Sequence, residues 1–345
     1  RKNVAIGYQA LRVQNSDADN FNTAVGYQAG VAVTTGVKNT FIGGLAGDAT
    51  TTASENVAVG YDSLGTNILG SHSVAIGPSA LRTQNYGTAT NAYNTAVGSF
   101  AGYAVTTGTA NTLIGGQAGD AITTGASNVA VGWNSLTTST TASENTAVGQ
   151  SSLGLNTTGS YNTAVGKSSL GANTTGVQNV AVGQASLDAN TTGNYNTGLG
   201  DNALSANTTA SSNTAIGQAS LFYNTTGASN VAVGASALTA NTTGASNVAV
   251  GKSALAANTE GTYNVAMGLE SLDANTTGNS NTGIGTSSLS SNTTGTQNAG
   301  LGMGTLTANT TASNNTAVGY NALVANTTGA QNTSVGQLSG AANTT

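Results

Sequence analysis

The sequence predicts an all-β fold, a parallel β-roll or β-solenoid of 20 coils in which each coil is one copy of a repeat of about seventeen residues. A motif of the form Asn-Thr-Ala-Val-Gly recurs along all 345 residues, and its glycine is present in all 20 copies. Successive glycines are seventeen positions apart except at two places, where the step is 19 and 21. A short fixed period is typical of stacked repeat architectures. β-Branched residues recur in every copy without the apolar stripe of a helix, which favours strands.

We number each unit from its asparagine, so that it reads N-T/V-A-V/I-G-x-x-A/S-L-x-A-N-T-T-G-x-x and the invariant glycine is position 5. Position 4 is always Val, Ile, Leu or Met, from Ile6 to Val335. Positions 2 and 4 share one face of a strand because side chains alternate, so we expect both to point into the coil. Position 3, which is Ala in 14 units, is then expected to point outward.

The remainder of the unit is predicted to hold two turns and a second short strand. Glycine at position 5 is expected where a positive φ or a close backbone approach is needed. Leu at position 9 marks a second apolar point, and Asn at position 12 and Gly at position 15 are turn residues. Position 15 is Ala in four units, so small size is expected to matter there more than a positive φ. Asn-Thr-Thr matches an N-glycosylation acceptor, but we interpret it as the turn of the repeat.

Position 1 is Asn in 19 units, with Ser73 as the exception. Identical residues lie above one another in stacked coils, and their amides can hydrogen-bond as a ladder. We therefore predict a structural role for this column. The ladder residues singled out are Asn162, Asn179, Asn196, Asn213, Asn230 and Asn247.

Two regions differ in regularity. Residues 1–144 form a duplicated four-coil block with enlarged loops at Gln14–Phe21 and Gln84–Tyr93, and residues 145–345 repeat without insertion. Four units of the first region have Gly in place of Leu at position 9, and they are predicted to compensate with a different residue at position 12. The residues at position 12 of these units are Val33, Thr50, Val105 and Ile122.

Composition disfavours several classes of function. Charged residues make up 6% of the chain and the net charge is −5, so no basic stripe for nucleic acid is expected. There is no cysteine and no apolar run as long as a membrane-spanning helix needs, so neither thiolate chemistry nor a spanning segment is predicted. His72 is the one histidine and is interpreted as an exposed loop residue without a carboxylate cluster near it. We predict no enzyme activity, no catalytic residue, no metal and no cofactor.

Aromatic residues gather at positions 6 and 17, which flank the predicted strand. Exposed rings can stack on sugars, but packing between chains or covering of a strand edge is the favoured explanation of their exposure. The two enlarged loops are the other places where a receptor contact is expected, and the alternative is that they are tolerated surface insertions without a binding role. The candidate glycan or receptor contacts are Tyr8, Asp17, Asp19, Phe21, Tyr27, Tyr61, Tyr86, Tyr93 and Trp133.

A single chain would have a thin core. Each coil orders a whole repeat of the chain but has only two or three Val- or Leu-sized side chains to bury. The flat column of Ala at position 3 would let another chain pack closely. These observations predict self-association, most simply as a three-fold assembly.

The motifs also resemble a known family. Ser73-Val74-Ala75-Ile76-Gly77 and the related Asn-Val-Ala-Val-Gly copies resemble the head repeats of trimeric autotransporter adhesins. The longer form with A-L-x-A-N-T-T-G between motifs looks like the shaft repeats of phage and environmental tail-fibre proteins. The resemblance covers the whole chain. It implies a left-handed parallel β-roll, three chains about one axis, and a place on a virion or a bacterial cell surface.

The predicted function is a non-catalytic structural fibre segment: the shaft of a trimeric tail fibre, a surface adhesin or an extracellular filament. Its partners would be its own copies, with further assembly into a filament left open, and a cell-surface glycan. The alternative is a protein that binds ice or a polysaccharide through its repetitive face, since position 14 carries a long column of Thr.

Overall fold

The computed structural model describes residues 2–15 and 18–345 of the chain. Within these residues the regular secondary structure is all strand, and the fold is a parallel β-solenoid of about 20 coils. The chain divides into two compact units, Arg1–Thr175 and Gly176–Thr345, which are described separately. No helix in the described part of the chain is long and apolar enough to cross a membrane.

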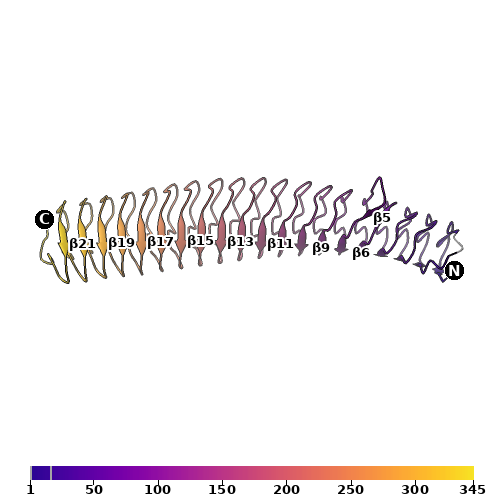
Figure 1. Ribbon diagram of the computed structural model, residues 1–345, viewed down its shortest axis with the longest axis horizontal. Helices are drawn as coiled ribbons and strands as arrows, with labels where there is room; N and C mark the ends of the chain where they lie inside the picture. Colours follow the sequence, from indigo (N-terminus) through magenta and orange to yellow (C-terminus); the bar gives the residue numbers. More distant parts are fainter. Residues whose placement is uncertain (1, 16–17) are drawn as a thin grey trace. The chain divides into compact units, whose positions relative to one another are not determined.

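Each coil contributes one strand of three residues, which covers positions 2 to 4 (Figure 1). The strands of the first unit are β1 (Val4–Ile6), β2 (Thr23–Val25), β3 (Thr40–Ile42), β4 (Val57–Val59), β6 (Val74–Ile76), β8 (Thr95–Val97), β9 (Thr112–Ile114), β10 (Val129–Val131), β11 (Thr146–Val148) and β12 (Thr163–Val165). Those of the second unit are β13 (Val180–Val182), β14 (Thr197–Leu199), β15 (Thr214–Ile216), β16 (Val231–Val233), β17 (Val248–Val250), β18 (Val265–Met267), β19 (Thr282–Ile284), β20 (Ala299–Leu301), β21 (Thr316–Val318) and β22 (Thr333–Val335). Two further strands, β5 (Gly70–Ser71) and β7 (Thr90–Asn91), pair beside the second enlarged loop.

Within each unit, successive strands pair in parallel and in register, so that equal positions of neighbouring coils are partners. Val231, Ala232 and Val233 of β16, for example, pair with Val248, Ala249 and Val250 of β17. This register places each position of the repeat in a column along the stack. The predicted one-unit-per-coil architecture is confirmed.

The predicted direction of the strand side chains is wrong. Position 3 points inward: Ala215 and Ala232 are 0% exposed. Position 4 points outward: Ile216 is 37% exposed and Leu301 40% exposed. So short a coil leaves little room between its strand and the opposite segment, so the small residue lies inside and the β-branched residues lie outside. The Ala column is therefore core and not a surface for another chain.

The interior opposite position 3 is filled from positions 8 and 9. Leu238 at position 9 and Ala237 at position 8 are both 0% exposed. The same holds for Leu221 and Ser220 in the preceding coil. The fully buried side chains therefore form a narrow layer that continues from coil to coil within each unit. It holds Ala at position 3, Ser or Ala at position 8 and Leu at position 9.

The position-5 glycines are required by both conformation and space. Gly183 has a φ of +134°, and a Cβ on it would lie 2.3 Å from the carbonyl oxygen of Gly200 in the next coil. Such a contact lies well inside van der Waals distance, so no other residue fits. At position 15, Gly227 lacks a positive φ, and the alanines that replace it in four coils are buried, with Ala53 2% and Ala210 5% exposed. The expectation that small size decides position 15 is confirmed.

The predicted second strand does not form. Position 9 adopts a left-handed conformation, with φ of 51° at Leu238, and position 7 does likewise, with φ of 56° at Ser236. A strand cannot run through two left-handed residues. These segments bond instead from coil to coil: the Leu238 N–H donates to the carbonyl of Ala254 at 3.0 Å.

Two columns of buried asparagine run along the coils. At position 1, Asn230 Oδ1 accepts from the backbone N–H of Asn247 at 3.0 Å, and Asn247 Nδ2 donates to the carbonyl of Gly261 at 2.7 Å. At position 12, Asn241 Nδ2 donates to Asn224 Oδ1 at 2.8 Å. The six asparagines singled out at position 1 are all 0% exposed: Asn162, Asn179, Asn196, Asn213, Asn230 and Asn247. Because the Asn of Asn-Thr-Thr is position 12, its amide is part of the interior.

Candidate functional site

The outer face of each strand carries a column of exposed apolar side chains. The exposed members at position 4 in the second unit are Leu199 (45%), Ile216 (37%), Met267 (42%), Ile284 (39%), Leu301 (40%) and Val335 (68%). The first unit shows the same face, with Ile42, Ile76 and Ile114 about equally exposed. In a parallel sheet both faces are normally covered, so this face is chemically suited to a partner surface. We call the outward columns of positions 2 and 4 the sheet face.

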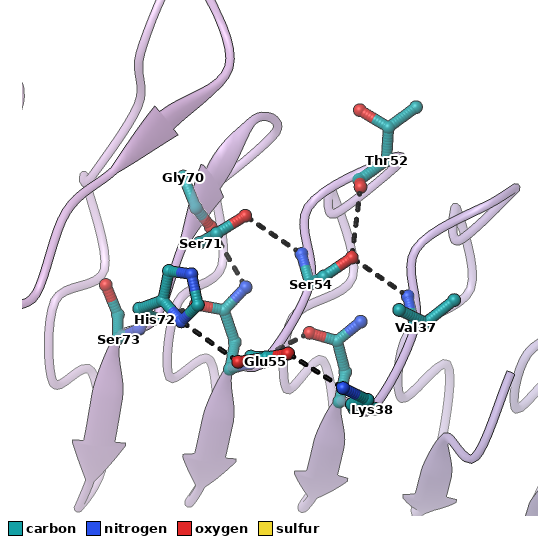
Figure 2. A network of polar contacts seen from close by, with 11 residues as sticks. Val37, Lys38, Thr52, Ser54, Glu55, Gly70, Ser71, His72 and Ser73 are labelled. Carbon is teal, nitrogen blue, oxygen red and sulfur yellow. Dashed lines mark hydrogen bonds and ion pairs between the residues drawn. The ribbon is translucent and has the colours of Figure 1, made fainter.

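A polar network lies at position 17 of three successive coils, at the edge of the sheet face (Figure 2). Glu55 Oε1 accepts from Lys38 Nζ at 3.0 Å, and Glu55 Oε2 lies 3.2 Å from His72 Nδ1. The Lys38 ammonium, with a smaller effect of His72, holds the pKa of the Glu55 carboxyl below its usual range. The groups are partly exposed, so the network contributes little to stability.

Backbone geometry aligns these side chains. Lys38, Glu55 and His72 have φ of 58°, 61° and 61°, so they leave the chain in the same direction. Ser54 and Ser71, one residue before Glu55 and His72, fix the turn: Ser71 Oγ accepts from the Ser54 N–H at 3.0 Å, and Ser54 Oγ accepts from the Val37 N–H at 3.1 Å. Figure 2 shows this hydroxyl chain beside the ion pairs. His72 was expected to have no carboxylate cluster near it, and among the described residues it has one carboxylate partner, Glu55.

Tyr93 extends the column at the base of the second loop. Its ring stacks on His72 with centroids 5.2 Å apart and an interplanar angle of 15°. At the first loop, Lys2 pairs with Asp19 at 2.9 Å and lies 5.3 Å from the centroid of Phe21. Asp17, a predicted contact, lies outside the described residues. The structure thus brings Asp19 and Phe21 together, and Tyr93 joins a network that contains charged groups.

Tyr86 differs from the other candidates because it is buried. Only 6% of the residue is exposed, its hydroxyl donates to the Gly108 carbonyl at 2.8 Å, and Asn94 Nδ2 donates to that hydroxyl at 3.2 Å. Burial raises the pKa of Tyr86 to about 12. The ring cannot present a face to a ligand, so the prediction of Tyr86 as a contact is corrected: the loop folds inward over the coil.

The position-6 aromatics are exposed. Tyr8 is 64% exposed, Tyr27 54%, Tyr61 61% and Trp133 54%. Tyr8 and Tyr27 stack with centroids 5.5 Å apart. Gln28 Nε2 donates to Gln9 Oε1 at 2.8 Å, and Gln9 Nε2 donates to the Tyr8 hydroxyl at 3.3 Å. The column therefore combines rings with oriented amides.

Among residues 2–15 and 18–345, no group of three His, Asp or Glu side chains is placed to hold a metal ion. Sequence reasoning missed Lys38 and Glu55 as partners of His72. The signal was present, because the three residues are spaced by 17 and so share one column.

No protein-family model matches the chain, and the search of curated proteins found no similar one.

Proposed function

We propose that the protein is a non-catalytic structural fibre segment in which several copies, most simply three, pack through the sheet face. The observation that carries this proposal is the composition of position 4. It is apolar in all 20 units although none of these side chains is buried. Exposed positions 6 and 17, by contrast, vary freely between aromatic, charged and polar residues.

A partner for such a face must match it over many coils. Strand spacing repeats at about 4.8 Å, and a second copy of the chain has that same spacing by construction. Packing of Val, Ile and Leu against one another would bury the apolar surface that a single chain leaves in water. The resemblance to trimeric adhesin heads and tail-fibre shafts agrees with a three-fold, left-handed arrangement. It also supports an extracellular setting, on a virion or a bacterial surface, with attachment to a surface glycan.

The Thr columns give less support to an ice-binding function. At position 13 the Thr hydroxyls are used within the protein: Thr208 Oγ1 donates to the Thr225 carbonyl at 3.2 Å, and Thr242 Oγ1 to that of Thr259 at 3.1 Å. Only the position-14 column remains to present outward hydroxyls, and Glu260 interrupts it. A flat face with two free Thr columns is therefore not formed.

The test is the mass of the assembly in solution. We expect sedimentation equilibrium to give about three times the chain mass of 33.4 kDa. The double variant Ile216→Asp/Ile284→Asp places charges on the sheet face and is expected to shift the equilibrium toward the single chain while the circular dichroism stays native. The matched control Gln218→Asp/Thr286→Asp adds the same charges two residues on, at exposed position 6. A wild type that is monomeric at micromolar concentration would refute the proposal.

A further inference from the structure

Two aromatic rings of the first unit lie beside glycines of the preceding coil. A Cβ on Gly44 would lie 3.5 Å from Cδ2 of Tyr61, and a Cβ on Gly116 would lie 3.5 Å from Cδ1 of Trp133. The two pairs occupy the same place in the duplicated four-coil blocks. The remaining position-6 residues of the blocks have diverged: Tyr8 and Tyr27 in the first correspond to Pro78 and Ser99 in the second.

The fold does not require glycine at Gly44 or Gly116. Neither has a positive φ, and an added Cβ would meet only the aromatic ring, at an ordinary contact distance. Other coils carry long side chains at position 6, such as Leu269 and Lys252. What glycine provides is the absence of a side chain beside the ring, and more than half of each aromatic residue is exposed.

We propose that Tyr61 and Trp133, each exposed beside a glycine, are two equivalent platforms for sugar rings of an extended, neutral β-linked glycan running along the coils. This inference deepens the proposed function by naming the class of surface glycan. It rests on the proposed function only for the extracellular location of the protein, because both platforms are present in a single chain. Aromatic rings with exposed faces stack on the C–H faces of pyranose rings.

The surroundings favour an uncharged linear ligand over a protein partner. All nine position-6 residues from Tyr8 to Gln150 are uncharged. The two platforms are four coils apart, about 19 Å at the strand spacing, and one coil is about as long as one ring of an extended β-linked chain. The stacked pair Tyr8 and Tyr27, with the amides of Gln9 and Gln28 beside it, continues the strip with groups that suit sugar hydroxyls.

The experiment uses two neutral probes, cellohexaose and hexa-N-acetylchitohexaose. Trp133 is the one tryptophan of the chain, so its fluorescence reports directly on a sugar stacked at that platform. Isothermal calorimetry measures Kd for the whole strip. We expect at least one hexasaccharide to bind and to shift the Trp133 emission. Tyr61→Ala and Trp133→Ala are each expected to weaken Kd by about tenfold.

The sharper variant is Gly44→Leu/Gly116→Leu, which keeps both aromatic residues but fills the space beside their rings. We expect it to lose binding at an unchanged melting temperature, because Leu is already accommodated at position 6 in Leu269. The matched control is Ala235→Leu, at exposed position 6 with Lys252 and no ring in the next coil. It should bind like wild type.

Three results would overturn the inference: no binding of either hexasaccharide, binding that the double Leu variant leaves intact, or a change of assembly mass in that variant. The last would assign the rings to contacts between copies. Sedimentation of the same samples separates this inference from the proposed function, since a monomer that still binds the sugar retains the platforms but not the fibre.

Discussion

The coils that contain Phe41 and Leu113 differ from the regular coils in which position supplies the large buried side chain. In these two coils it is position 3, and in a regular coil it is position 9, across the interior. In a regular coil a small Ala232 at position 3 lies inside with large Leu221 and Leu238 at position 9. In the coil of β3 the sizes are reversed: Phe41 is fully buried, and Cβ atoms added to Gly30 and Gly47 would lie 2.8 and 2.4 Å from its ring. One large residue at position 3 thus replaces two large residues at position 9.

The second four-coil block repeats this exchange. Cβ atoms added to Gly102 and Gly119 would each lie 2.7 Å from Leu113. Because Leu113 is smaller than Phe41, more of the interior is filled from position 12, where Cδ1 of Ile122 lies 2.8 Å from the Cβ position of Gly119. The predicted compensation between positions 9 and 12 is therefore only part of the exchange. The larger part comes from position 3, across the interior.

We expect the largest effect on stability when the large side chain at position 3 is removed. Phe41→Ala should leave a cavity bounded by two glycines and destabilise the protein by about 3–5 kcal/mol, measured by urea unfolding. Adding Gly30→Leu and Gly47→Leu should restore most of this loss, since it returns the large side chains to position 9, as in a regular coil. Leu64 adopts a φ of 50° at the equivalent position, so Leu is compatible with the left-handed conformation of Gly47. A triple variant no more stable than Phe41→Ala would show that the exchange does not operate.

This comparison also explains what the sequence could predict. The period, the strand position and the invariant glycine follow from a repeat of 20 units, and all were predicted. The direction of the strand was not, because alternation identifies two faces but does not say which is inside. The missing information lay in the exceptions. Phe41 and Leu113 occur only where position 9 loses its Leu, and this size exchange identifies position 3 as the inward one.

The reverse substitution in a regular coil should have a smaller effect. Ala232→Phe would overpack the space between Leu221 and Leu238 and is expected to cost about 1–3 kcal/mol in thermal or urea unfolding. Leu221→Gly and Leu238→Gly, added together, should recover part of the loss. The neighbouring control Val233→Phe lies on the sheet face and should change the stability of the single chain little. Equal losses at Ala232 and Val233 would contradict the inward and outward assignment.

The candidate site was less predictable than the fold. Exposure of Tyr8, Tyr61 and Trp133 follows from their variable position in the repeat. The burial of Tyr86 does not, since it lies in a loop whose length departs from the period and whose path the repeat cannot specify. The pairing of Glu55 with Lys38 and His72 needed the column register, which places equivalent residues of successive units side by side.

The two asparagine columns show a second exchange in the irregular region. Position 1 is Ser73 instead of Asn, and position 12 of the same coil is Gln84 instead of Asn. The longer Gln84 side chain reaches the shorter Ser73 side chain, since Gln84 Nε2 donates to Ser73 Oγ at 3.0 Å. Gln84 Oε1 also accepts from Asn94 Nδ2 at 2.9 Å, and that amide lies against the Tyr86 hydroxyl. The enlarged loop is thus joined to the buried polar column through Tyr86.

The smallest expected effect tests this junction. Tyr86→Phe removes the hydrogen bond to the Gly108 carbonyl and the one accepted from Asn94 Nδ2, which keeps its other acceptors, and should cost about 1 kcal/mol near pH 7. The difference between wild type and variant should also depend on pH. A tyrosine ionises near pH 10 in an unfolded chain, whereas burial raises the pKa of Tyr86 to about 12 in the folded protein. The contribution of the Tyr86 hydroxyl to stability is then fully present below pH 10 and is lost as the pH rises to about 12, because only the unfolded chain releases the proton in that window.

Chemical unfolding of both proteins from pH 8 to pH 12 should therefore show wild type losing its advantage in stability over Tyr86→Phe above pH 10. Parallel stability curves over this range would mean that the hydroxyl is accessible to water and that the loop does not close over it.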